Sequence, residues 1–402
     1  MLILGIVLVT YNTLNAQELA TYIEEAQTNN PEIRVFALRH TIADEQINET
    51  QSLPNTELSA GYFVSEPETR TGAQKARFSI RQMLPWFGSI TARKNYATTM
   101  AEAEYIDIAI AKRKLSLSVA TTYYRLYAIK AKQRVIASNI NVLKTYEKLA
   151  LTSVTVGKAS TVDVLRLQIR QNELVQQHNI LEQEYHAAQH AFNTLLNRDE
   201  NIPVVVVDSL SIPETDPVSE TDNLQPHPEL VKYDKLYASV EELEILNQKE
   251  STPGIGIGLD YVVVAERPDM NFSDNGKDIF MPMIAVSLPV FNRKYRSRTQ
   301  QHNLKKQELI AAKAQRNNTL NTLLAKARTG QTAAKIRYDT QSVNLERAED
   351  ARNILMKSYE TGTINVNDVL DVQELQLKFQ IHQIEAAQNY YEQTALINYL
   401  IR

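Results

Sequence analysis

Two short turns that contain a glycine occur at matching places in the two halves of the chain. They comprise Val156, Gly157 and Lys158 in the first half and Thr361, Gly362 and Thr363 in the second. An aspartate follows each turn, Asp163 and Asp368, and Asp371 lies one helical turn beyond Asp368. Asp368 and Asp371 therefore lie on one helix face, and in an oligomer they would repeat as rings of carboxylates, which favour the passage of cations. For Asp163 and Asp368 the alternative is capping of the helix that follows.

Pairs of histidines and methionines raise the question of a metal site. His186 and His190 are four residues apart, and Met281 and Met283 alternate along a strand, where thioethers suit soft metals. No His-Glu-x-x-His motif accompanies the histidines. We interpret the histidines as solvated and the methionines as packed or facing a lumen, and we predict no metal and no cofactor.

The composition excludes several classes of protein. The chain has 402 residues, a formal net charge of −4 and no cysteine, which excludes disulfides, thiolate metal sites and cysteine nucleophiles. Apolar residues make up 43%, as in a folded protein, and no basic stripe indicates nucleic acid binding. The sequence contains no phosphate-binding loop and no Gly-x-Ser-x-Gly elbow, so we predict that the protein is not an enzyme.

Four segments alternate between apolar and polar residues in the manner of β-strands. They occupy residues 56–65, 76–81, 255–263 and 282–288. Such strands are typical of a transmembrane β-barrel, in which Arg77, Arg81 and Asp260 would line the lumen; the alternative for these three residues is ordinary cross-strand pairing. Four strands cannot close a barrel, so other copies of the chain must complete it. The alternative is a pair of amphipathic hairpins on a soluble core.

The amino terminus has the features of a secretory signal. A short apolar run from Leu2 to Val9 precedes the small residue Ala16, and we predict a cleaved signal peptide at 1–16. The run is too short to span a bilayer, which takes about 20 residues. A buried N-terminal strand is the alternative. Since no later segment has the pattern of a transmembrane helix, entry into a membrane would use β-strands.

Long helices are predicted where apolar residues recur with coiled-coil spacing. Residues 91–154 lack proline and glycine, and their apolar or small residues step by three and four with one exception at Arg113. Three later leucines are seven residues apart: Leu167, Leu174 and Leu181. A similar seam is predicted in the second half at Leu370, Leu377, Ile384 and Tyr391.

The two halves repeat one another, which sets the domain organisation. The motif at 84–88 recurs at 288–292, with Pro85 and Pro289 in the same place. We predict a first repeat at 17–200, a linker at 201–226 and a second repeat at 227–402. Each repeat is expected to contain a helix, a β-hairpin and a long helical hairpin. The predicted hairpins lie at about 56–83 and 254–290, and the helical hairpins at 91–198 and 296–401.

The duplicated motifs at Pro85 and Pro289, and the duplicated turns before Asp163 and Asp368, resemble the TolC family of outer-membrane efflux proteins. The resemblance covers nearly the whole chain and is greatest to the metal and drug efflux branch represented by CusC and CzcC. It implies a mainly α protein with a transmembrane β-barrel. Four strands per protomer would give a 12-stranded barrel in a trimer, continued by a helical barrel across the periplasm. The cysteine of the lipoprotein members is absent.

The same resemblance implies a function and partners. It predicts a passive outer-membrane exit duct of a tripartite efflux system in a Gram-negative bacterium, carrying metal ions or small toxic compounds. The partners would be a periplasmic adaptor and an inner-membrane pump, of the resistance-nodulation-division type, with outer-membrane lipid around the barrel. The turns at Gly157 and Gly362 would form the tips that dock the adaptor. Two alternatives stay open: the exit duct of a type I protein secretion system, and a periplasmic coiled-coil scaffold.

Overall fold

The structure is a computed structural model of the chain. It describes residues 18–157, 160–214, 227–269, 271–290, 293–361 and 363–401. The expected signal peptide, Lys158, Gly362 and residues 215–226 of the expected linker lie outside the described residues.

The described part of the chain is mainly helical, with one antiparallel sheet. After a helix over residues 18–29, the elements in chain order are α2 (Pro31–Glu49), β1 (Glu57–Tyr62), β2 (Glu68–Thr69), β3 (Gly72–Leu84), α3 (Ser89–Thr155), α4 (Thr161–Leu195), α5 (Pro228–Glu250), β4 (Gly254–Val264), β5 (Ile279–Ser287), α6 (Arg293–Glu360) and α7 (Val366–Ile401). No described helix contains a stretch that is both long and apolar enough to span a bilayer.

The chain divides into two compact units, and each unit draws on both sequence repeats. The helical unit takes Met1–Val35, Ile108–His227 and Asn317–Arg402, and the strand-containing unit takes Phe36–Asp107 and Pro228–Arg316. Helices α3 and α6 contribute to both units. The units therefore do not coincide with the repeats that the sequence defines.

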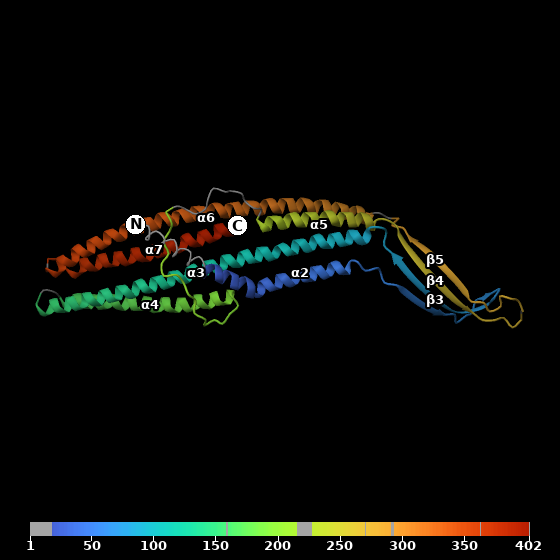
Figure 1. Cartoon of the computed structure of the whole chain (residues 1–402), viewed down its shortest axis with the longest axis horizontal. Helices are drawn as coiled ribbons and strands as arrows, with labels where there is room; N and C mark the ends of the chain where they lie inside the picture. Colours follow the sequence, from blue (N-terminus) through green and yellow to red (C-terminus); the bar gives the residue numbers. More distant parts are fainter. Residues whose placement is uncertain are drawn as a thin grey trace, which may run out of the picture. The chain divides into compact units, whose positions relative to one another are not determined.

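In the helical unit α4 returns along α3, and α7 returns along α6 (Figure 1). The leucines predicted to form the α4 seam are buried, as is Ala188 one heptad further: Leu167, Leu174, Leu181 and Ala188. At its start α4 has a capping box, in which the Ser160 hydroxyl accepts a hydrogen bond from the Val162 amide at 3.2 Å. Heptad burial and this cap together explain where α4 begins and which face it buries.

The seam predicted for α7 is only partly correct. Leu377 is buried, but Leu370, Ile384 and Tyr391 are half-buried. Polar residues occupy part of the buried stripe instead, and Gln373 is one of them, since its amide donates to the Asn139 side chain of α3 at 2.5 Å. A search for apolar residues alone misses such positions because a satisfied amide pair can replace an apolar contact.

Tyrosine hydroxyls hold the described part of the expected linker against the helical unit. Val204 and Val207 are buried. Hydroxyls accept from three backbone amides of this segment: Tyr22 from Val205 at 3.1 Å, Tyr123 from Val207 at 3.2 Å and Tyr127 from Leu210 at 2.9 Å. This segment is therefore packed on the helices rather than free of them.

The sheet joins the two predicted hairpins into one surface. Its strand order is β1-β3-β4-β5, with β2 paired to β3, and every pairing is antiparallel. The central pairing, β3 with β4, places Ser79 opposite Asp260 and joins the first repeat to the second. In this order β1 and β5 lie at the two edges.

Candidate functional site

One face of the sheet is apolar and exposed across all its long strands. Cross-strand pairing brings together Leu58, Ile80 and Leu259 in one row, and Tyr261 and Phe280 in another. Leu259 is half-buried, whereas the other four are exposed, with Leu58 at 77% and Phe280 at 66%. Further exposed apolar residues on the same face of the sheet are Tyr62, Phe78, Ile257, Ile284 and Val286. A contiguous apolar face of this kind indicates contact with lipid or another apolar surface.

The opposite face of the sheet carries the polar residues that the sequence assigned to a lumen. Arg77 forms an ion pair with Asp260 across β3 and β4, and Asp260 is fully buried. Arg81 lies two residues along β3 from Ser79, the residue opposite Asp260. It is exposed, and its side chain lies beside Gly258. The structure thus brings Arg77 and Asp260 together as a cross-strand pair, while Arg81 shares their face without joining the pair.

The first turn ends α3 with a glycine in the left-handed conformation. Gly157 has φ +72°, and its amide donates to the Val154 carbonyl at 3.0 Å. A Cβ built on Gly157 would meet no atom within 4 Å, so backbone conformation alone explains the glycine. Val156 beside it is 64% exposed. The turn therefore presents an apolar side chain at the surface.

The second turn is tied to the end of α6 by its threonines. The Ser358 carbonyl accepts from the Thr361 hydroxyl at 2.9 Å and from the Thr363 amide at 3.0 Å. Both threonines are exposed. These bonds satisfy a carbonyl at the helix end that would otherwise lack a partner.

The three aspartates have different surroundings. Asp163 completes the capping box, because its carboxylate accepts from the Ser160 amide at 3.2 Å. Asp368 and Asp371 are exposed near the start of α7. Asp163 therefore has a structural role at the cap, whereas the α7 pair is exposed to solvent.

The acidic stripe continues beyond the residues singled out from the sequence. Glu374, three residues after Asp371, pairs with Arg170 of α4 at 3.0 Å. Arg166 of α4 donates to the Asn367 side chain at 2.7 Å. The i, i+3 spacing from Asp371 was the sequence signal for Glu374, but its partner Arg170 on α4 could not be found from sequence spacing. These contacts join the starts of α4 and α7.

The histidines considered for a metal site are not part of a metal-binding group among the described residues. His190 pairs with Glu200 at 2.8 Å. Within the described ranges, no group of three or more histidine, aspartate or glutamate side chains is arranged to hold a metal ion. Met283 lies beside Gly258 on the same face of the sheet as Arg81.

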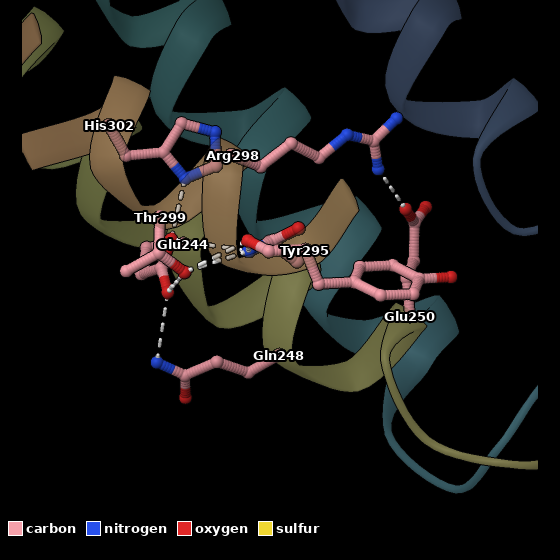
Figure 2. Close-up of polar contacts among 8 residues, drawn as sticks. Glu244, Gln248, Glu250, Tyr295, Arg298, Thr299 and His302 are labelled. Atoms are coloured by element: carbon pink, nitrogen blue, oxygen red, sulfur yellow. Dashed lines mark hydrogen bonds and ion pairs between the residues drawn. The ribbon is translucent and has the colours of Figure 1, made fainter. Parts of the chain in front are cut away.

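A polar cluster joins α5 to α6 near the sheet (Figure 2). Glu244 contacts His302 at 2.6 Å and accepts from the Thr299 hydroxyl at 2.8 Å and from Gln248 at 3.3 Å. Burial acts to raise the pKa of Glu244, but the hydrogen bonds from these three side chains outweigh it and leave the pKa below its ordinary value. Arg298 and Glu250 add an ion pair at 3.0 Å.

Comparison with known protein families identifies the first half of the chain. Residues 22–198 match the family model described as outer membrane efflux protein. The match lies within the first repeat and covers less than half of the chain. No curated protein sequence matches the chain significantly. Since the family consists of outer-membrane efflux channels, which are not enzymes, the family agrees with the prediction that the chain catalyses no reaction.

Solved structures of similar fold extend the comparison over nearly the whole chain. The outer-membrane channel OprN has a TM-score of 0.78 at 17% identity, covering 96% of this chain and 90% of that one. VceC from Vibrio cholerae has a TM-score of 0.75 at 16% identity, covering 96% of each chain. CusC has a TM-score of 0.76 at 14% identity, covering 96% and 92%. The predicted TolC-like fold, with long helical hairpins and a small antiparallel sheet, is confirmed.

Proposed function

We propose that the protein is the outer-membrane exit duct of a tripartite efflux system, carrying metal ions or small toxic compounds outward. The proposal rests on the exposed apolar face of the antiparallel sheet, in a chain whose residues 22–198 match the outer membrane efflux protein family. Exposure of this apolar face to water is unfavourable, whereas contact with the hydrocarbon core of a membrane is favourable. In the outer membrane the face would contact lipid, and Arg77, Arg81 and Asp260 would face the lumen.

The duct would be a homotrimer. The sheet has its edges at β1 and β5, and backbone groups at an edge must be paired in lipid. Antiparallel pairing of β5 with β1 of the next copy supplies that pairing, and three copies give the 12-stranded barrel that the resemblance implies.

The two turns would form the end that docks the periplasmic adaptor, which in turn binds an inner-membrane pump of the resistance-nodulation-division type. Exposure of Val156, Thr361 and Thr363 supports this assignment. Asp368 and Asp371 would repeat in the trimer as an acidic constriction, since both are exposed near this turn. Asp163 belongs to the capping box of α4 in the same region, where it accepts from the amide of the N-cap residue Ser160.

Planar-bilayer conductance of the detergent-purified protein, measured together with its mass in solution, tests the proposal. We expect a trimer that forms stable cation-selective channels. A monomer that forms no channels would contradict the duct and favour a periplasmic scaffold. Identification of the pump that copurifies then distinguishes the two functions. A resistance-nodulation pump would support efflux, and an ABC-type pump would support protein secretion.

A further inference from the structure

A cavity of about 260 Å³ lies within the helical unit, between the helix over residues 18–29, α3 and α7. Leu19, Ile23 and Leu117 contribute to its apolar wall, and Lys112 and Arg113 contribute positive charge. None of the described residues that line it is an aspartate or a glutamate. The cavity therefore combines an apolar interior with cationic groups that no lining carboxylate neutralises.

Arg113 is the residue that interrupts the heptad seam of α3, where an apolar side chain would be expected. Its Nη1 atom is buried and has no hydrogen-bond partner within the described part of the chain. Burial lowers the pKa of Arg113, and Tyr399 partly opposes this effect. Arg113 as a whole is half-buried, but its buried Nη1 atom lacks an acceptor among the described residues, and a desolvated donor without a partner is destabilising. A folding role therefore does not explain why this atom points into the cavity wall.

We propose that this cavity binds a small organic anion, whose carboxylate pairs with Arg113 and whose apolar body packs on Leu19, Ile23 and Leu117. An arginine guanidinium matches a carboxylate through paired N–H donors. Gln27 and Ser116, which are joined by a 2.9 Å hydrogen bond, supply further polar groups in the wall. At ~30 Å³ per water molecule, the cavity has the volume of about nine waters, which suits an aromatic or medium-chain carboxylate.

Binding of 3-phenylpropanoate and of its uncharged amide to the purified full-length protein in detergent tests the inference. Isothermal titration calorimetry should show that the acid binds at least about tenfold more tightly than the amide, since each 1.4 kcal/mol is a factor of ten. The Arg113→Met variant should lose this preference, and Arg113→Lys should keep part of it. The readout is binding, so it does not depend on whether the protein conducts.

Lys144→Met is the matched control, because Lys144 is an exposed residue of the same helix and the charge change is equal. It should bind the acid as the unchanged protein does. Arg113→Met should also unfold at an equal or higher temperature without ligand, because the buried Nη1 donor that lacks an acceptor in the described chain is removed. The inference is overturned if the unchanged protein binds neither compound, as when a neighbouring copy fills the cavity. It is also overturned if acid and amide bind equally, or if Arg113→Met keeps the preference.

Discussion

A single backbone angle explains why glycine occupies position 157, in the turn between α3 and α4. Gly157 has φ +72° and open space around its α-carbon, so the cost of a side chain there is conformational rather than steric. Gly157→Ala should raise the free energy of the native turn by about 1 kcal/mol. Hydrogen exchange of the amides around the turn should quicken by a factor of about 5. The neighbouring exposed substitution Val156→Ala should leave exchange nearly unchanged; equal effects of the two would contradict the explanation.

The carboxylate of Glu244 should make stability depend on pH in the acid range. Its pKa in the folded protein is lowered, so its contribution is complete above the ordinary value of 4.5 and is lost as the pH falls through the lowered value. Glu244→Gln should reduce the free energy of unfolding by about 1–3 kcal/mol at neutral pH, because hydrogen bonds to a charged group are lost.

Thermal unfolding of the detergent-solubilised protein at neutral pH and at a series of decreasing pH values measures both effects on Glu244, since the carboxylate becomes protonated as the pH falls through its lowered pKa. The difference between the unchanged protein and Glu244→Gln should shrink in acid. Glu308→Gln is the control, because Glu308 lies in an exposed i, i+3 pair with Lys305 on α6, and its effect should be within about 0.5 kcal/mol. A difference that persists undiminished in acid would show that packing, not charge, explains the Glu244 variant.

At the scale of the elements, adjacent residues of β5 offer a test of the two sheet faces. Ile284 is 81% exposed on the apolar face, and Met283 lies on the face that carries Arg81. Ile284→Lys should impair membrane insertion, since a lysine facing lipid costs about 2–4 kcal/mol near the bilayer midplane. Met283→Lys, a change of similar size on the opposite face, should leave insertion intact. Membrane fractionation of the two variants measures this, and equal insertion would contradict lipid contact at Ile284.

The elements themselves could largely be predicted from the sequence, because their periodicities are long and regular. Alternation along β3 and β4 separates an apolar from a polar face of the sheet, and the leucine heptads of α4 mark the buried side of that helix; the structure agrees with both. The buried positions of α7 were harder to predict, because Gln373 is buried through its pairing with Asn139 of α3. These two residues lie far apart in the sequence. For the same reason the pairing of Glu374 with Arg170 could not be predicted.

At the scale of the whole molecule, copies of Asp368 and Asp371 would lie around one axis in the proposed trimer. Asp368→Asn combined with Asp371→Asn should lower the cation selectivity of single channels, because the field of the acidic ring is removed. Reversal potentials in asymmetric salt measure this. The double variant Glu182→Gln with Glu184→Gln on α4 removes the same charge away from the turn and is expected to leave selectivity nearly unchanged. Unchanged selectivity in the aspartate variant would contradict the constriction.

The position of β1 and β5 at opposite edges of the sheet has a genetic consequence. If each copy completes the sheet of its neighbour, a copy with a damaged edge but intact helices still enters the assembly and leaves a gap in it. In a cell that expresses both forms, most assemblies would then contain at least one damaged copy. Alleles that alter these edges should therefore be dominant over the normal gene, whereas alleles that prevent the chain from folding should be recessive.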